Sequence, residues 1–152
     1  MTNLVIRPAV EPDVAAITRV VDDAYADFIP LTGRAPTPMF DDYPALVAQG
    51  KVWVLLDDGA VVGAAVLLPA EDHLLLRTVA VAPSHQSGGH GRRLIAFAEE
   101  ETRRRGLAEI RVFTNVTMAK SIRLYRGLGY EEYKRAMQEG YFRVFMRKRL
   151  AS

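Results

Sequence analysis

The hydrophobic positions of the chain change their spacing several times along its 152 residues, and each change predicts a new element. Apolar residues three and four apart make one helix face from Pro12 to Phe28, and Pro30 is expected to end that helix. A longer helix is expected over 89–105, with glutamates placed four residues before arginines in the favoured order for ion pairs. Runs rich in Val and Leu, bounded by turn residues, predict strands at 4–7, 52–56, 61–68, 74–81, 109–113, 130–135 and 142–148, and shorter helices are expected at 41–49 and 118–126.

The central strand runs are apolar at consecutive positions, which is typical of a sheet covered on both faces. The last run differs, because residues 143–147 alternate between basic and apolar side chains as a half-exposed antiparallel strand does. No repeat, low-complexity tract or linker divides the chain. We therefore expect one α/β (α+β) domain spanning 1–152.

Composition narrows the classes of function. Hydrophobic residues make up 49% of the chain, enough for a substantial core, and the absence of cysteine excludes disulfides, thiol nucleophiles and Cys-based zinc sites. A net charge of +2 gives no support for a nucleic-acid partner. The sequence shows no signal-peptide h-region and no apolar run of bilayer length, so we expect a cytoplasmic protein without a membrane partner. His85 and His90 are too isolated to suggest a metal site.

The most informative stretch runs from Val79 to Leu94, where an apolar strand enters a glycine-rich turn that opens a helix. The first N–H groups of a helix have no internal partner and carry partial positive charge, so they suit an anion. Gly88, Gly89 and Gly91 lack the Cβ atoms that would hold phosphate oxygens away from the backbone. The segment therefore predicts a phosphate-binding turn.

Two arginines occupy the first helical turn, where the helix dipole disfavours cations. Arg92 and Arg93 either face a bound anion or are solvated surface residues, and the anion is the better explanation for at least one of them. Two other phosphate motifs fit less well. A Walker A loop needs Lys-Ser/Thr after its last glycine, and a dinucleotide fingerprint needs a third glycine where Leu94 stands.

Here the chain resembles a known family. The run Gln86-Ser87-Gly88-Gly89-His90-Gly91 is similar to the Gln/Arg-x-x-Gly-x-Gly/Ala signature of GNAT acetyltransferases, and the later run 124–130, Leu-Tyr-Arg-Gly-Leu-Gly-Tyr, matches a second family pattern. His90 replaces the usual aliphatic residue and Ser87 replaces a common glycine. Neither change removes a backbone donor, so we expect cofactor binding to persist.

The resemblance implies the GNAT fold: a mixed, largely antiparallel sheet of about six to seven strands flanked by about four helices. It also implies acetyl-CoA as cosubstrate and direct attack by a primary amine of a small molecule, peptide or protein in a ternary complex. No metal is implied, and a homodimer is common in the superfamily. By similarity, the cofactor contacts fall to Val79, Val81, Gln86, Ser87, Gly88, Gly89, His90, Gly91, Arg92, Asn115, Ser121 and Tyr125.

The same resemblance assigns chemical roles. The Val81 N–H is the candidate donor to the developing oxyanion, and Tyr125 occupies the place of the family tyrosine that protonates the departing thiolate. The alternative for Tyr125 is a core tyrosine on an amphipathic helix, sharing a face with Ile122. Asn115 and Ser121 bracket the start of that helix, so each either contacts the pantetheine arm or caps the helix.

The general base and the acceptor are left open by the sequence. Arg77 stands where many relatives carry an acidic residue, and His73 and Glu71 lie at the other end of that strand, so a water chain or an amine that arrives neutral are alternatives. The acceptor is expected against the mixed aromatic and acidic stretch from Tyr25 to Tyr43, which suits a cationic amine, with Tyr141 closing the other side.

Because Arg77 replaces an acid, a second function is open: a protein of this fold that binds an acyl-CoA as a sensor or subunit without catalysis. A nucleotide-binding regulator is a third and poorer alternative. The identity of the acceptor amine cannot be read from the sequence.

Overall fold

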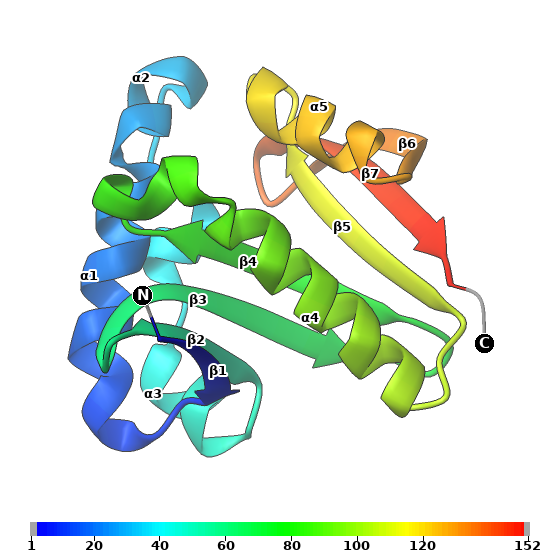
Figure 1. Ribbon diagram of the computed structural model, residues 1–152. Coiled ribbons are helices and arrows are strands. Elements are labelled where there is room, and N and C mark those ends of the chain that lie inside the picture. Colours follow the sequence, from blue (N-terminus) through cyan, green and yellow to red (C-terminus); the bar gives the residue numbers. More distant parts are fainter. Residues whose placement is uncertain (1–2, 151–152) are drawn as a thin grey trace.

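A computed structural model describes residues 3–150. Its strands form one seven-stranded sheet in the order β1-β2-β3-β4-β5-β7-β6 (Figure 1). Neighbours are antiparallel except for β4 and β5, which are parallel. The bounds are β1 Leu4–Pro8, β2 Val52–Asp57, β3 Ala60–Pro69, β4 Leu74–Val81, β5 Glu109–Asn115, β6 Glu131–Gln138 and β7 Tyr141–Arg149. The expected mixed, largely antiparallel sheet is confirmed, and each strand lies within a few residues of its predicted span.

Helices cover both faces of the sheet, as the apolar strand runs predict. On one face, Ile17 and Val21 of α1 and Val47 of α3 pack against β2 and β3. On the other face, Leu94 and Ala98 of α4 lie in the larger core cluster together with residues of α5. The bounds are α1 Val14–Tyr25, α2 Ile29–Thr32, α3 Tyr43–Ala48, α4 His90–Arg104 and α5 Ala119–Gly127. No helix within residues 3–150 has the length and apolar character needed to cross a membrane.

The prediction that Pro30 ends the first helix is wrong. The chain passes from α1 through the 3₁₀ turn Ala26–Phe28 into α2, and Pro30 lies in the first turn of α2. Proline is tolerated there because the first N–H groups of a helix have no intrahelical acceptor. Gly33 ends α2 in the left-handed conformation, with φ of 79°. The expected helix at 41–49 is shorter, because Asp42 caps α3 by accepting from the Ala45 N–H at 3.1 Å.

The predicted ion-pair ladder on α4 is only partly correct. Glu101 pairs with Arg105 four residues on, at 3.6 Å, and also lies 3.8 Å from Arg104. Glu99 turns away from the ladder toward β7. It accepts from the Tyr130 hydroxyl at 2.9 Å and from Lys148 Nζ at 3.0 Å. Glu99 thus has partners on neighbouring elements.

The pairing between β4 and β5 is short, and this positions the site. The two strands are in register only over Leu74–Leu76 and Ile110–Val112. Beyond that point β4 continues beside β3 and β5 continues beside β7, so the strands diverge. Figure 1 shows the gap widening toward the ends of β4 and β5, near α5. The backbone of the last residues of β4 therefore has no strand partner on this side.

Candidate functional site

The end of β4 presents unpaired backbone groups to this opening. The Ala82 N–H donates to the Val62 carbonyl of β3 at 2.8 Å. Because the backbone groups of successive residues in a strand point in opposite directions, the N–H and C=O of Val81 and Val79 face away from β3. They face the gap left by β5, where an extended ligand could pair with them as a strand would.

Two side chains donate hydrogen bonds to the carbonyl groups at this edge of β4. The Tyr25 hydroxyl donates to the Val79 carbonyl at 3.2 Å, and Gln86 Nε2 donates to the Val81 carbonyl at 3.0 Å. The second bond folds the turn after β4 back onto the strand. It holds the side chain of Gln86, so a contribution of this residue to a bound phosphate would come from its backbone.

The turn after β4 leads directly into an uncapped helix. Residues Pro83–Gly88 form 3₁₀ turns, and Gly89, with φ of 77°, is the N-cap of α4. No side chain caps this end, so the first N–H groups of the 15-residue helix are free to bind an anion. A Cβ at Gly88 would lie 2.7 Å from the His90 ring, which explains why a residue without a side chain stands there.

One groove brings several predicted residues together. It has a volume of about 310 Å³ and lies between the end of β4, the start of α4 and α5. Six predicted cofactor residues are on its wall, namely Val79, Val81, Gln86, Gly91, Ser121 and Tyr125. The turn residues Ser87, Gly88 and Gly89 are exposed beside it, together with Arg92. Asn115 lines a different cavity, described below.

Tyr125 is buried in the last turn of α5 and lines the groove. Its ring packs edge-on against Tyr130, with 5.3 Å between ring centroids. Burial, with a smaller contribution from Tyr25, raises the pKa of the Tyr125 hydroxyl above its usual value of 10.0. The phenol is therefore neutral at physiological pH and able to donate a proton. Tyr125 therefore packs in the core and also lines the groove, so the structure is compatible with both alternatives for this residue.

The two histidines of the turn lie against each other, and His85 is also hydrogen-bonded. His85 contacts Ser84 Oγ through Nδ1 at 2.8 Å and Asp57 Oδ2 through Nε2 at 3.1 Å, which ties the turn to the end of β2. The rings of His85 and His90 lie 5.6 Å apart. Over residues 3–150 no group of three His, Cys, Asp or Glu side chains is arranged to hold a metal ion.

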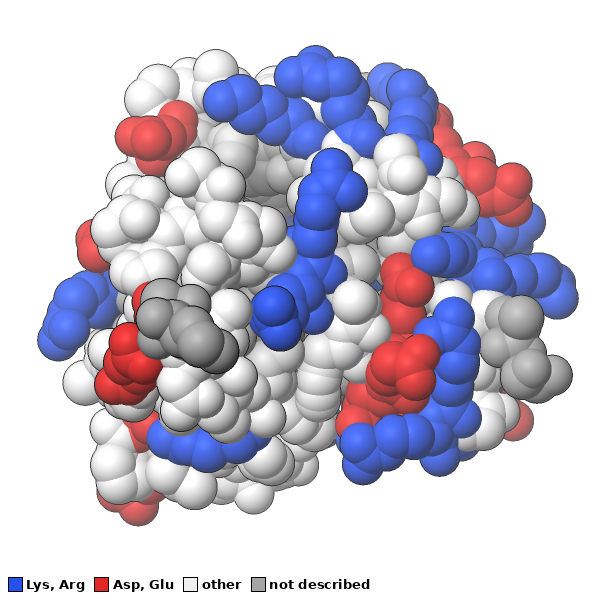
Figure 2. All heavy atoms as spheres, in the orientation of Figure 1, with Lys and Arg blue, Asp and Glu red and all other residues white. Residues whose placement is uncertain are grey.

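The rim of the groove is basic. Figure 2 shows Lys and Arg side chains over α5 and over the first half of α4, beside a hollow in the surface. The exposed basic residues at these positions are Arg92 and Arg93 of α4 and Lys120 and Arg123 of α5. Such a rim attracts a polyanionic ligand and raises its local concentration.

A second, smaller cavity of about 50 Å³ lies on the other side of the opening. A third hollow lies next to both: Met118 lines this hollow and the cavity, and Phe28, Gln86 and Lys120 line this hollow and the groove. We name the second cavity the acceptor pocket. Its walls come from α1, the α2–α3 segment, β4, β5 and β7, and they include Tyr25, Thr37, Arg77, Phe113, Asn115, Tyr141 and Arg143.

The acidic residues expected to meet a cationic amine are engaged elsewhere. Asp41 accepts two hydrogen bonds from Arg77, at 2.9 and 3.0 Å, and this pairing raises the pKa of the Arg77 guanidinium. Asp42 is exposed and caps α3. None of the described residues that line the acceptor pocket is acidic. The expectation of an acidic acceptor site is therefore not met.

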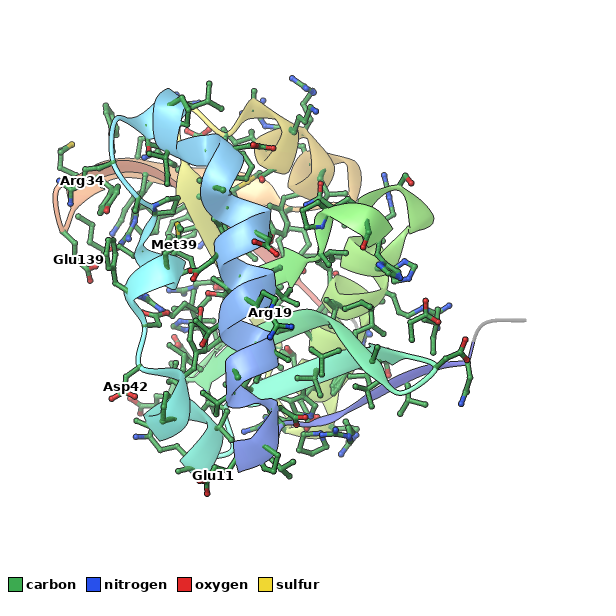
Figure 3. The ribbon with its side chains drawn as sticks, turned by 90° about the vertical axis from the view of Figure 1, so that its left-hand side faces the viewer. Glu11, Arg19, Arg34, Met39, Asp42 and Glu139 are labelled. Carbon is green, nitrogen blue, oxygen red and sulfur yellow. The ribbon has the colours of Figure 1, made fainter. Side chains whose placement is uncertain are left out.

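The β6–β7 hairpin closes the pocket, as expected for Tyr141. The Tyr141 hydroxyl donates to the Ala35 carbonyl, and the Arg34 guanidinium lies 3.9 Å from the centre of the Tyr141 ring. Figure 3 shows Arg34 beside Glu139, whose carbonyl accepts from Arg34 Nη2 at 3.1 Å. Arg143 is not among the predicted site residues, because an arginine in an alternating strand is expected to face solvent. In the structure it is only 3% exposed.

Comparison with known proteins agrees with this geometry. The chain is similar to the PaiA N-acetyltransferase of Thermoplasma acidophilum, solved in complex with coenzyme A, with a TM-score of 0.83 at 13% identity over 97% of this chain and 99% of that one. It is also similar to the putative acetyltransferase YncA of Salmonella typhimurium, solved with acetyl-CoA, with a TM-score of 0.73 at 26% identity over 99% and 95% of the two chains. These likenesses establish the fold.

A curated relative and a family model extend the likeness to sequence. Probable N-acetyltransferase 14 of Xenopus tropicalis is 28% identical over 88 residues, which span 56% of this chain and 43% of that relative. The model of the acetyltransferase (GNAT) family matches residues 17–130, which include β4, the turn, α4 and α5. Because that match takes in most of the chain and both motifs that carry the resemblance, the protein belongs to the GNAT family of acetyltransferases.

Proposed function

We propose that the protein transfers the acetyl group of acetyl-CoA to a primary amine by direct attack in a ternary complex. The observation that carries this proposal is the groove itself. It joins the unpaired edge of β4 to the uncapped N-terminus of α4, with a neutral tyrosine at its inner end. A phosphate-bearing, amide-containing cofactor matches both halves, and related structures hold coenzyme A or acetyl-CoA.

The turn would bind the pyrophosphate. Backbone N–H groups from Gln86 to Arg92 and the dipole of α4 supply the positive potential, with the basic rim adding long-range attraction. Ser87, Gly89 and Gly91 offer backbone donors without bulky side chains. His90 replaces an aliphatic residue, but its N–H is unaffected by the side chain.

The pantetheine arm would lie along β4. Its amides can pair with the backbone of Val79 and Val81 as an added strand. Ser121 lines the groove and is positioned to contact the arm. Asn115 instead accepts from the Thr117 N–H at 3.0 Å and from its hydroxyl at 2.8 Å, which favours a role in shaping the turn before α5.

The reaction forms an N–C bond and breaks the C–S bond. The Val81 N–H faces the opening and is our candidate to stabilise the oxyanion. Tyr125 would give its proton to the thiolate and recover one from solvent. Because the described lining of the acceptor pocket holds no carboxylate, the amine proton would leave through water.

The Arg77–Asp41 pair also supports a second function. Arg77 stands where a carboxylate base would be useful, and the carboxylate beside it, Asp41, is held in the ion pair. The absence of a free carboxylate among the described residues at this point of β4 is expected of an acyl-CoA sensor or subunit that lacks catalysis.

One experiment separates the two functions: calorimetry with CoA, followed by thiol release from acetyl-CoA with a panel of amines. We expect binding and turnover. Binding with no turnover on any amine would favour the sensor. Absence of CoA binding would refute both.

A further inference from the structure

Arg143 carries a buried positive charge into the acceptor pocket. It extends from β7, is 3% exposed and lies against two aromatic rings, with its guanidinium carbon 4.4 Å from the centre of Phe113 and 5.5 Å from that of Tyr141. A charge held at this depth is costly unless an opposite charge or several hydrogen bonds stabilise it.

The partners of Arg143 are mostly neutral. Its Nη1 donates to Gln138 Oε1 at 2.6 Å and its Nη2 to Thr37 Oγ1 at 3.0 Å. Arg143 also forms an ion pair with Glu139, but Oε2 lies 3.8 Å from Nη2, beyond hydrogen-bond distance, on a side chain that is 59% exposed. A guanidinium has five N–H donors, and these two hydrogen bonds use two of them.

The other arginine of the pocket is in a different state. Arg77 forms a two-point ion pair with Asp41, and both side chains are at most 19% exposed. The positive charge of Arg77 is thus neutralised by a hydrogen-bonded carboxylate, whereas that of Arg143 is compensated only by the longer ion pair with Glu139. Burial, and after it the proximity of Arg77, lowers the pKa of Arg143 although the carboxylates of Glu139 and Asp41 act in the opposite direction, so an anion bound here would relieve both penalties.

We propose that the acceptor is a small primary amine that also carries a carboxylate, as an amino acid does, and that Arg143 binds this carboxylate. The proposal rests on the proposed acetyl transfer and specifies its substrate class. The pocket offers a planar guanidinium fork, hydroxyl and amide groups from Thr37, Thr114 and Asn115, and no acidic described residue. A cationic polyamine would find no counter-charge there.

The geometry also orients such a substrate. Arg143 is on the β7 wall of the pocket, whereas Met118 is on the wall shared with the hollow that adjoins the groove. A carboxylate held at Arg143 would leave the amine to point toward this side, where Val79 and Tyr125 line the groove. The small volume, about 50 Å³, favours acceptors in which few bonds separate the two groups.

The test compares matched acceptors in the wild-type enzyme. The panel contains the twenty amino acids, β-alanine and γ-aminobutyrate, and each amino acid is paired with its amide and its decarboxylated amine. We expect at least one carboxylate-bearing amine to have a kcat/KM about 10- to 150-fold above those of its two partners, the range that a charge-assisted hydrogen bond gives. Aminomethylphosphonate replaces glycine in one arm to distinguish a carboxylate site from a general anion site.

The variant Arg143→Met keeps the side-chain volume and removes the charge, so the preference for carboxylate should disappear while CoA affinity stays the same. Arg147→Met is the control, because Arg147 is on the same strand and lies outside the pocket. Calorimetry with CoA shows that each variant has folded and that the cofactor groove is intact.

The outcomes are distinguishable. Loss of CoA binding in the wild type would refute the proposed function itself. With CoA binding intact and at least one amine turned over, equal turnover of amino acids and their amides, no turnover of any carboxylate-bearing amine, or a preference unchanged in Arg143→Met would each overturn the role of Arg143. A stronger preference for aminomethylphosphonate than for glycine would overturn the assignment to carboxylate.

Discussion

The cofactor groove and the acceptor pocket are neighbours, but they are built in different ways. Half of the groove lining comes from one continuous segment, in which β4, a turn and α4 follow each other and offer mainly backbone groups, and most of the other half comes from α5. The acceptor pocket collects side chains from five separate segments. Tyr141 of the pocket hydrogen-bonds to Ala35, 106 residues away in sequence.

This difference has a functional consequence. Backbone donors at a helix N-terminus and a strand edge bind the same cofactor whatever the surrounding side chains are. In a pocket whose side chains come from distant segments, a substitution in one segment can change one wall and leave the others as they are. If the proposed function is right, the groove holds the cofactor and the pocket selects the amine, and variants should affect one region without the other.

The largest effect is expected where the two regions meet, at Tyr125. Replacing it in Tyr125→Phe removes the proposed acid and should lower kcat by about 10²- to 10⁴-fold, with CoA affinity unchanged in calorimetry. In the wild type, kcat should show no alkaline decline due to Tyr125 below pH 10, because burial raises its pKa above the usual 10.0.

Tyr130→Phe is the matched control for this variant. Tyr130 packs against Tyr125, but its hydroxyl donates to Glu99 and does not line the groove. We expect kcat to change little. Equal losses in both variants would mean that the aromatic packing matters and that Tyr125 is no acid.

A middle-sized effect is expected from Asp41→Asn, which leaves the Arg77 charge without its partner. The pair is mostly but not fully buried, so the free energy of unfolding should fall by about 2 kcal/mol, between the values for exposed and buried pairs. The acceptor KM should rise because this pair forms part of the pocket wall, while the Kd for CoA stays constant.

Asp42→Ala tests the neighbouring carboxylate, which caps α3 away from the pocket. We expect a loss of about 1 kcal/mol in denaturant melts and an unchanged acceptor KM. A changed CoA affinity in Asp41→Asn would show that the two regions are not independent.

A smaller effect than that of Asp41→Asn is expected from a pair of glycines at opposite ends of α4. Gly89 and Gly106 have φ of 77° and 72°, and a Cβ on either would meet no atom within 4 Å. Alanine should therefore cost about 1 to 2 kcal/mol of stability at both positions, through backbone strain alone. Denaturant melts measure this loss.

The two alanine variants should differ in cofactor binding. Strain at Gly89 disturbs the proposed phosphate turn and should weaken CoA by up to about tenfold in calorimetry, since about 1.4 kcal/mol corresponds to a factor of ten. Gly106→Ala should bind CoA as the wild type does. If both variants bind equally well, the turn before α4 is not the phosphate site.

Most of the fold was predictable because its signals are local. Strand runs, helix faces and the glycine turn are each written in consecutive residues, and the structure departs from them only where contacts between elements intervene. Glu99 binds Tyr130 and Lys148 on other elements, and Pro30 lies in the first turn of a new helix instead of ending one.

The sequence by itself determined the order of the elements, the apolar faces that build the sheet and the segment proposed to hold the cofactor, because periodicity and uncapped helix N–H groups are properties of consecutive residues. Only the tertiary structure decided that β4 and β5 separate, that Asp41 neutralises Arg77 and that Arg143 is buried with its charge weakly compensated. Those features depend on pairings between residues far apart in the chain, where no local pattern records which side chain will find which partner.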